Sequence, residues 1–273
     1  MLTEVLAWMI ATGVEWAIDS ERTIATVEMS AIELRWVIPT VAMSVIDSKW
    51  VTATALATAM ESGRMIATEV KSEIESMKVT ATGVKSAMVL GRMIATGVEW
   101  AIDLGRMIAM GAKSAIESEQ MTATGARTVF DSGRMIATEV KLAMESERMI
   151  ATEMEWAVDS EQMTATVAKS AIESRWVIAM ELESAIDSGR TIATGAESAM
   201  EWGRMIATEL ESAIDWEQTI ASEVKLVMEL ERLNAMGVKS AMKLARMIAT
   251  ELELAIDWEQ MIATGEKLAM VSK

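Results

Sequence analysis

The apolar positions of the chain follow a pattern that repeats every 14 residues. The repeating unit is numbered so that Arg134 is position 1 and Glu147 is position 14. In that unit one apolar stripe consists of Ile136, Ala137, Val140, Ala143 and Met144. Steps of one, three and four residues trace one face of an α-helix, at heptad positions a, d and e. The pattern therefore predicts a mainly α fold, a long amphipathic helix or helical hairpins built from two-heptad repeats.

The unit is repeated in tandem from near the start of the chain to its end. The sequence Arg-Met-Ile-Ala-Thr begins at Arg64 and again at Arg92, two units later. The same frame starts at Trp8 and gives 19 units without insertion or deletion. Such a fixed period is the signature of a repeat protein. Residues 1–7 are expected to form an N-terminal lead, and residues 8–273 a single tandem-repeat array.

A β-strand interpretation of the same unit stays open as the alternative. The odd positions of one unit hold Ile94, Thr96, Val98, Trp100 and Ile102. Alternation of these β-forming residues with the even positions is typical of a half-buried strand. An even unit length keeps the alternation in register from one unit to the next. The alternative fold is a β-solenoid with 14 residues in each coil.

The need for corners favours the helix over the solenoid. A coil of this length requires sharp bends, which usually contain Gly, Asn or Pro. All 14 Gly residues fall at positions 6 and 14, and other units hold Glu there, such as Glu69 and Glu119. Glu adopts a positive φ only at a cost, so the glycines are not placed for bends. In the favoured helix, Pro39 is expected to produce a kink or break near Ile38.

The differences between units follow the genetic code more closely than side-chain chemistry. All ten Trp residues fall at positions 1, 9 and 13, where other units mostly hold Arg or Gln at the first and Ser or Leu at the others. No side-chain property joins a guanidinium, an amide and an indole, but their codons differ by single bases. The array is therefore interpreted as a recently expanded DNA repeat whose copies drift with little filtering by packing.

Composition excludes several classes of function. The chain has no Cys, His or Tyr, which removes disulfides, thiolate nucleophiles, imidazole bases and the commonest zinc ligands. Its net charge of −16 disfavours nucleic acids and anionic membrane surfaces as partners. The longest uncharged stretches have 11 residues, whereas a membrane-spanning helix needs about 20 apolar residues. Without a spanning segment or a signal peptide, a cytoplasmic location is expected by default.

The residues that carry chemistry form no asymmetric site in the sequence. Carboxylates recur four residues apart as Glu99 with Asp103, Glu155 with Asp159, Glu211 with Asp215, and Glu253 with Asp257. On a helix each pair shares a face, but a Ca²⁺ site needs about six or more oxygen ligands, so these pairs are interpreted as a solvated acidic face. No catalytic residue, cofactor, metal site or small-molecule ligand is predicted, and the chain is not expected to be an enzyme.

Threonine forms the most regular polar column. It fills position 5 in 15 of the 19 units, and four units have Thr-Ala-Thr at positions 3 to 5. On a β-solenoid this column would be a ladder with about 4.8 Å between residues, which resembles the surfaces of ice-binding solenoids. On the favoured helix it is a polar column that drifts between Thr and Met.

Three hypotheses for function follow from these patterns. The preferred one is a low-complexity repeat product without a selected enzymatic role. The second is a structural protein that self-associates through the apolar stripe, in the manner of a coiled coil. The third is a β-solenoid that binds a surface such as ice through its Thr column.

Overall fold

Every secondary-structure element in the computed structural model is a β-strand. The structure describes residues 9–18 and 21–270. The elements are β1 (Met9–Ile18), β2 (Arg22–Ile32), β3 (Trp36–Ile172) and β4 (Trp176–Met270). These ranges contain no helix, so the predicted mainly α, coiled-coil-like fold is wrong and the alternative, a parallel β-solenoid, is the fold. It follows that the described ranges offer no helix able to cross a membrane.

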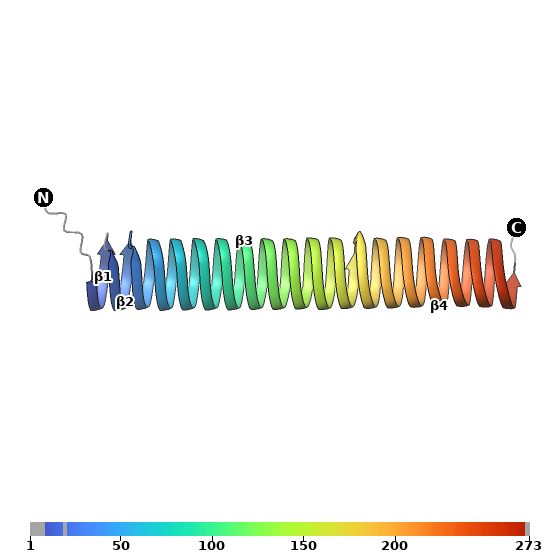
Figure 1. Ribbon diagram of the computed structural model, residues 1–273, viewed down its shortest axis with the longest axis horizontal. Coiled ribbons are helices and arrows are strands. Elements are labelled where there is room, and N and C mark those ends of the chain that lie inside the picture. The colour runs from blue at the N-terminus through green and yellow to red at the C-terminus, as the bar shows by residue number, and fades with distance from the viewer. Residues whose placement is uncertain (1–8, 19–20, 271–273) are drawn as a thin grey trace. The chain divides into compact units, whose positions relative to one another are not determined.

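Each 14-residue unit forms one coil of the solenoid, and neighbouring coils pair in parallel. Ile10 pairs with Ile24, Ile24 pairs with Ile38, and Ala165 pairs with Ala179. The paired residues of these strands therefore lie beside the residue at the same position of the next unit, about 4.8 Å away. β1, β2 and the start of β3 lie side by side as successive coils (Figure 1). β3 and β4 are long because strand structure continues without interruption around many coils.

The chain divides into two compact units, Met1–Ala137 and Thr138–Lys273. β1, β2 and most of β3 belong to the first unit, and β4 belongs to the second. Both units are built from the same coil, with the same 14-residue register. The segment 1–7, predicted as a lead, lies outside the described residues.

The interior of each coil is formed by positions 2, 4, 7, 10 and 13. In coil 134–147 the buried side chains are Met135, Ala137, Val140, Ala143 and Ser146. The predicted stripe shares three of these, but Ile136 is 53% exposed and Met144 is only half-buried. Positions 2 and 4 are two residues apart, as on a flat strand, whereas the other inward positions are three apart. The step of three marks corners, where two successive side chains point outward.

The left-handed corner lies at position 12 and is formed by acidic residues in every described case but Lys243. All twelve non-glycine residues with positive φ that the structure describes occupy this position, including Glu75 (φ 53°) and Asp131 (φ 46°). No described glycine has a positive φ. The glycines, at outward positions 6 and 14, therefore do not supply left-handed bends, as expected, but this did not exclude a solenoid. A left-handed L-residue costs roughly 1–2 kcal/mol, and the fold accepts this cost in coil after coil.

Pro39 does not interrupt the fold. It lies within β3, inward at position 4, and pairs with Ala25 of the preceding coil. The break predicted near Ile38 is absent, because the extended backbone of a coil suits the φ of proline. The described strands instead end at residues 33–35 and 173–175, where the sequence has Arg at position 14 before Trp at position 1.

Candidate functional site: a threonine and isoleucine face

Positions 1 to 5 of each coil form a flat strand with positions 3 and 5 pointing outward. The outward side chains at these two positions are called the Thr/Ile face. Ile66 and Ile94 at position 3 are 50% and 51% exposed. Thr68 and Thr96 at position 5 are also exposed, while Ala67 between Ile66 and Thr68 is buried. Isoleucines assigned to a buried stripe by sequence therefore lie on the surface, beside the threonines.

The Thr/Ile face is continuous over many coils of the first unit. Seven successive coils have an exposed threonine at position 5: Thr12, Thr26, Thr40, Thr54, Thr68, Thr82 and Thr96. In the second unit, Thr138, Thr152 and Thr166 are exposed in successive coils before Met180 interrupts the column. In the Thr-Ala-Thr units both threonines face outward, as Thr80 and Thr82 do. Each of the two compact units therefore presents rows of hydroxyl and methyl groups.

The geometry of the Thr/Ile face is regular in two directions. Along a column, side chains repeat every ~4.8 Å, and two columns of one strand are separated by roughly 6.6 Å. Thr and Ile are both branched at Cβ, which restricts their side-chain rotation. In the second unit the Thr264 hydroxyl donates a hydrogen bond of 2.8 Å to the Thr250 carbonyl of the preceding coil. The face is thus a regular lattice of half-apolar side chains.

Planar side chains at position 1 stack along one edge of this face. The rings of Trp36 and Trp50 lie parallel, 2° apart in tilt, with centroids 4.9 Å apart. The guanidinium of Arg22 lies 5.6 Å from the Trp36 ring, and that of Arg64 lies 4.6 Å from the Trp50 ring. Cation–π contacts of this kind contribute about 0.5–1 kcal/mol at exposed sites. Arg and Trp therefore do share a property, planarity, which the sequence interpretation overlooked.

Exposed ion pairs connect neighbouring coils away from the Thr/Ile face. Lys113 Nζ lies 3.0 Å from Glu99 Oε1, and Lys267 Nζ lies 2.9 Å from Glu253 Oε1. The hydrogen bond from Lys113 and then its charge lower the pKa of Glu99, and Lys267 has the same effect on Glu253. In the same way the hydrogen bond with Glu211 raises the pKa of Lys225. Such exposed pairs add little stability.

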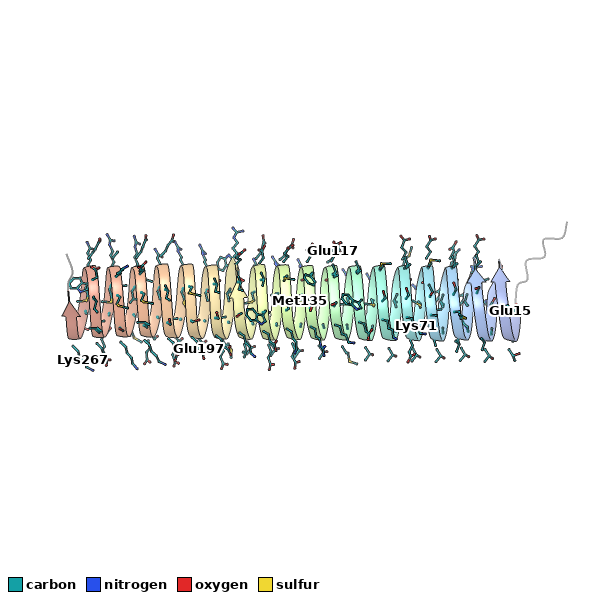
Figure 2. The ribbon with its side chains drawn as sticks, turned by 180° about the vertical axis from the view of Figure 1, so that it is seen from behind. Glu15, Lys71, Glu117, Met135, Glu197 and Lys267 are labelled. Atoms are coloured by element: carbon teal, nitrogen blue, oxygen red, sulfur yellow. The ribbon has the colours of Figure 1, made fainter. Side chains whose placement is uncertain are left out.

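The predicted carboxylate pairs are not brought together. Glu155 lies at position 8 and Asp159 at position 12, with the inward side chain of Ala157 between them. Glutamates of this kind contact lysines of the next coil instead, as Glu99 does. Figure 2 shows two charged side chains of the first unit, Lys71 and Glu117, on the outside of their coils. In the described part of the chain no three acidic side chains form a metal-binding group.

One buried acid escaped the sequence interpretation. Glu73 occupies position 10, where every other unit has Ala or Val, and its exposed fraction is 0%. Ser62 and Ser76, two successive members of the inward serine column at position 13, both donate hydrogen bonds to Glu73 Oε1. Burial raises the pKa of Glu73 to about 7, although the bonds from Ser76 and Ser62 act in the opposite direction. Comparison of position 10 across units is the signal that finds this residue.

The two arrangements with possible consequences for function are thus the repeated Thr/Ile face and the single buried acid, Glu73. The face recurs in both units and is exposed, whereas Glu73 is enclosed within one coil. Function has to be inferred from this geometry, because comparison of the chain with family models, with curated proteins and with solved structures finds no match.

Proposed function

We propose that the Thr/Ile face binds ice. The observation that carries the proposal is the run of exposed, in-register threonines at position 5 beside a column of exposed Ile or Thr at position 3. Self-association through the helical stripe is not proposed, since the positions of that stripe point partly inward and partly outward.

The physical basis is a match between two regular surfaces. Ice presents oxygen atoms at fixed spacings along two directions, and the Thr/Ile face presents methyl and hydroxyl groups at fixed spacings of similar size. The rotational freedom of these side chains is already restricted by Cβ branching and by the fold, so little entropy remains to be lost on binding. Methyl groups favour release of loosely held water, while hydroxyls hydrogen-bond to ordered water.

The substitutions at position 3 support a surface role for this face. Fourteen units have Ile there, four have Thr and one has Asn234, so Cβ branching is kept in all units but one while polarity changes. The exposed position accepts both, and both extend the same lattice.

Replacement of Thr68 by Tyr should abolish most of the ice-binding activity of the seven-threonine run in the first compact unit. Thr68 lies at the centre of the coils from Thr40 to Thr96, and a ring projecting from the face would hold ice away from its neighbours. The measurement is thermal hysteresis of the purified chain, with ice-crystal shape as a second readout. Lys71→Tyr places the same ring at exposed position 8 of the same coil and is the matched control. An inactive wild-type chain, or equal losses in both variants, would refute the proposal.

We also propose that the chain has no catalytic role. A face of repeated hydroxyls and methyl groups lacks the asymmetric set of acid, base and nucleophile that turnover requires. Assay against ester, glycoside and phosphate model substrates should give only the rate of the uncatalysed reaction. A turnover that one substitution in one coil abolishes would contradict this.

A further inference from the structure

Glu73 lies in an interior that contains no compensating charge. The coil before it contributes the inward residues Val51, Ala53, Leu56, Ala59 and Ser62. Its own coil contributes Met65, Ala67, Val70 and Ser76. The coil after it contributes Val79, Ala81, Val84 and Ala87. None of these described side chains is titratable or charged, so no cation can balance a carboxylate at this place.

The number of hydrogen atoms shared by Ser62 Oγ, Ser76 Oγ and Glu73 Oε1 depends on whether Glu73 is protonated. Ser62 Oγ lies 2.5 Å from Ser76 Oγ and 3.4 Å from Glu73 Oε1, and Ser76 Oγ contacts the same Oε1. This triangle has three close contacts. With an ionised carboxylate only the two hydroxyl hydrogens are available, so one contact brings together two oxygens without a hydrogen. A carboxyl protonated at Oε1 supplies the third hydrogen: Oε1 then donates to one serine instead of accepting from it, that serine donates to the other, and the ring closes.

The second carboxyl oxygen adds to the cost of ionisation. Within the described residues no donor reaches Glu73 Oε2. A buried oxygen without a donor is destabilising, and the cost grows when the group carries charge. At position 10 in neighbouring coils Ala59 and Ala87 leave no polar group beside it.

We propose that Glu73, Ser62 and Ser76 form a proton-controlled switch that keeps the coils between residues 50 and 91 closed when Glu73 is protonated and opens them when it ionises. In the closed state the carboxyl completes the ring of three hydrogen bonds. In the open state the carboxylate reaches water, and the inter-coil hydrogen bonds of these coils are broken. Removal of the proton is the only chemical change, and bulk water accepts it.

Opening would also interrupt the Thr/Ile face. The coils concerned carry Thr54, Thr68 and Thr82, three adjacent members of the seven-coil run. This consequence rests on the proposed function, whereas the opening itself does not. The two proposals can therefore fail separately. Ice binding can be lost while the coils stay closed, and the coils can open in a chain that does not bind ice.

Hydrogen–deuterium exchange at several pH values tests the switch. After correction for intrinsic exchange, protection of residues 50–91 should fall on the order of a hundredfold between pH 5 and pH 8, because the acid titrates near 7 in the closed coil and near 4.5 in the open one. Glu73→Gln should abolish this dependence, as should Glu73→Ala, which restores the Ala found at position 10 in most units. The Ala variant covers the case in which a buried amide prevents folding.

Glu69→Gln removes the same charge from an exposed position of the same coil and should leave the pH dependence in place. A switch local to Glu73 requires that peptides from the second unit show no matching fall in protection. The proposal is overturned if protection of residues 50–91 is independent of pH in the wild type. It is equally overturned if Glu73→Ala retains the full dependence, since the effect would then arise from the surface charge of the chain.

Discussion

Deletion of residues 148–161, one complete coil of the second unit, should leave the spectrum unchanged and shift the melting temperature by only a few degrees. The residues on either side of the deletion stay in the same 14-residue register, so every inward side chain meets the same position of a neighbouring coil. Stability in a repeat array is approximately a sum over units and their contacts. Deletion of residues 148–154 should instead cost roughly 5 kcal/mol or more, since half a coil cannot close and buried Met149 and Met154 are removed.

The comparison of these two deletions separates a solenoid from a heptad helix. Seven residues are one heptad, so a coiled coil would keep its seam after the short deletion. A solenoid loses register, because position 8 then follows position 14. Thermal melting followed by circular dichroism, with the β minimum near 218 nm, measures both variants. Equal melting temperatures in the two deletions would contradict the coil register described above.

Replacement of Ala171 by Glu should transfer the pH sensitivity of Glu73 to the second unit. Ala171 is fully buried at position 10, and the hydroxyls of Ser174 in the same coil and Ser160 in the preceding coil lie 3.0 Å apart. The arrangement matches that of Glu73 with Ser62 and Ser76. The new carboxyl would lie in an interior without charges, so burial should raise its pKa as it raises that of Glu73.

The sign of the effect follows from the raised pKa. Between about 4.5 and 7 the folded chain keeps the proton that the unfolded chain has already lost, so stability falls as the pH rises through this window. The difference of about 2.5 pKa units corresponds to about 3 kcal/mol lost above pH 7 relative to pH 4. Urea unfolding of Ala171→Glu at pH 4 and pH 8 measures it, with Ala171→Gln as the control. A loss of equal size in the Gln variant would show that bulk, not charge, is responsible.

The repeat length could be predicted from the sequence, but the fold class could not. The stripe at positions 3, 4, 7, 10 and 11 shares positions 4, 7 and 10 with the true interior. A coil that turns a corner every three residues produces the same i, i+3 spacing as a helix, so the two structures give similar apolar patterns. The positions that distinguish them are the buried Met135 and Ser146 and the exposed Ile136. Serine in a core column is not expected from hydrophobicity, and its burial becomes visible only in the structure.

The corners were missed for a related reason. Bends usually contain Gly, Asn or Pro, whereas the left-handed residues of this chain are mostly acidic, such as Glu75 and Asp131 at position 12. Sequence statistics link positive φ with Gly, Asn and Asp, and Glu is not expected to signal a corner. The Thr column was recognised in the sequence as a candidate surface. The neighbouring column of Ile at position 3 was not predicted to lie on the surface. Large aliphatic side chains are usually buried, whereas these are about half-exposed.

Contacts between neighbouring repeats could not be predicted from helical spacing along the chain. Glu99 with Lys113 and Trp36 with Trp50 are each 14 residues apart, and they meet because parallel coils bring equal positions together. The planar column at position 1 and the single acid at position 10 are both visible when the repeats are aligned by position. What the alignment does not show is that residues of one column become neighbours in space.

The in-register pairing of identical positions also bears on how such a chain can change its length. An ancestor with fewer coils and a descendant with more would present the same pairing surface at every internal junction, since Ala165 meets Ala179 as Ala11 meets Ala25. Duplication of one repeat in the gene inserts a coil that finds matching neighbours on both sides at once. Most proteins must pass through poorly folded intermediates to gain a structural element. In this fold, unequal recombination lengthens or shortens the protein by whole coils, and each product is already a folded member of the same series.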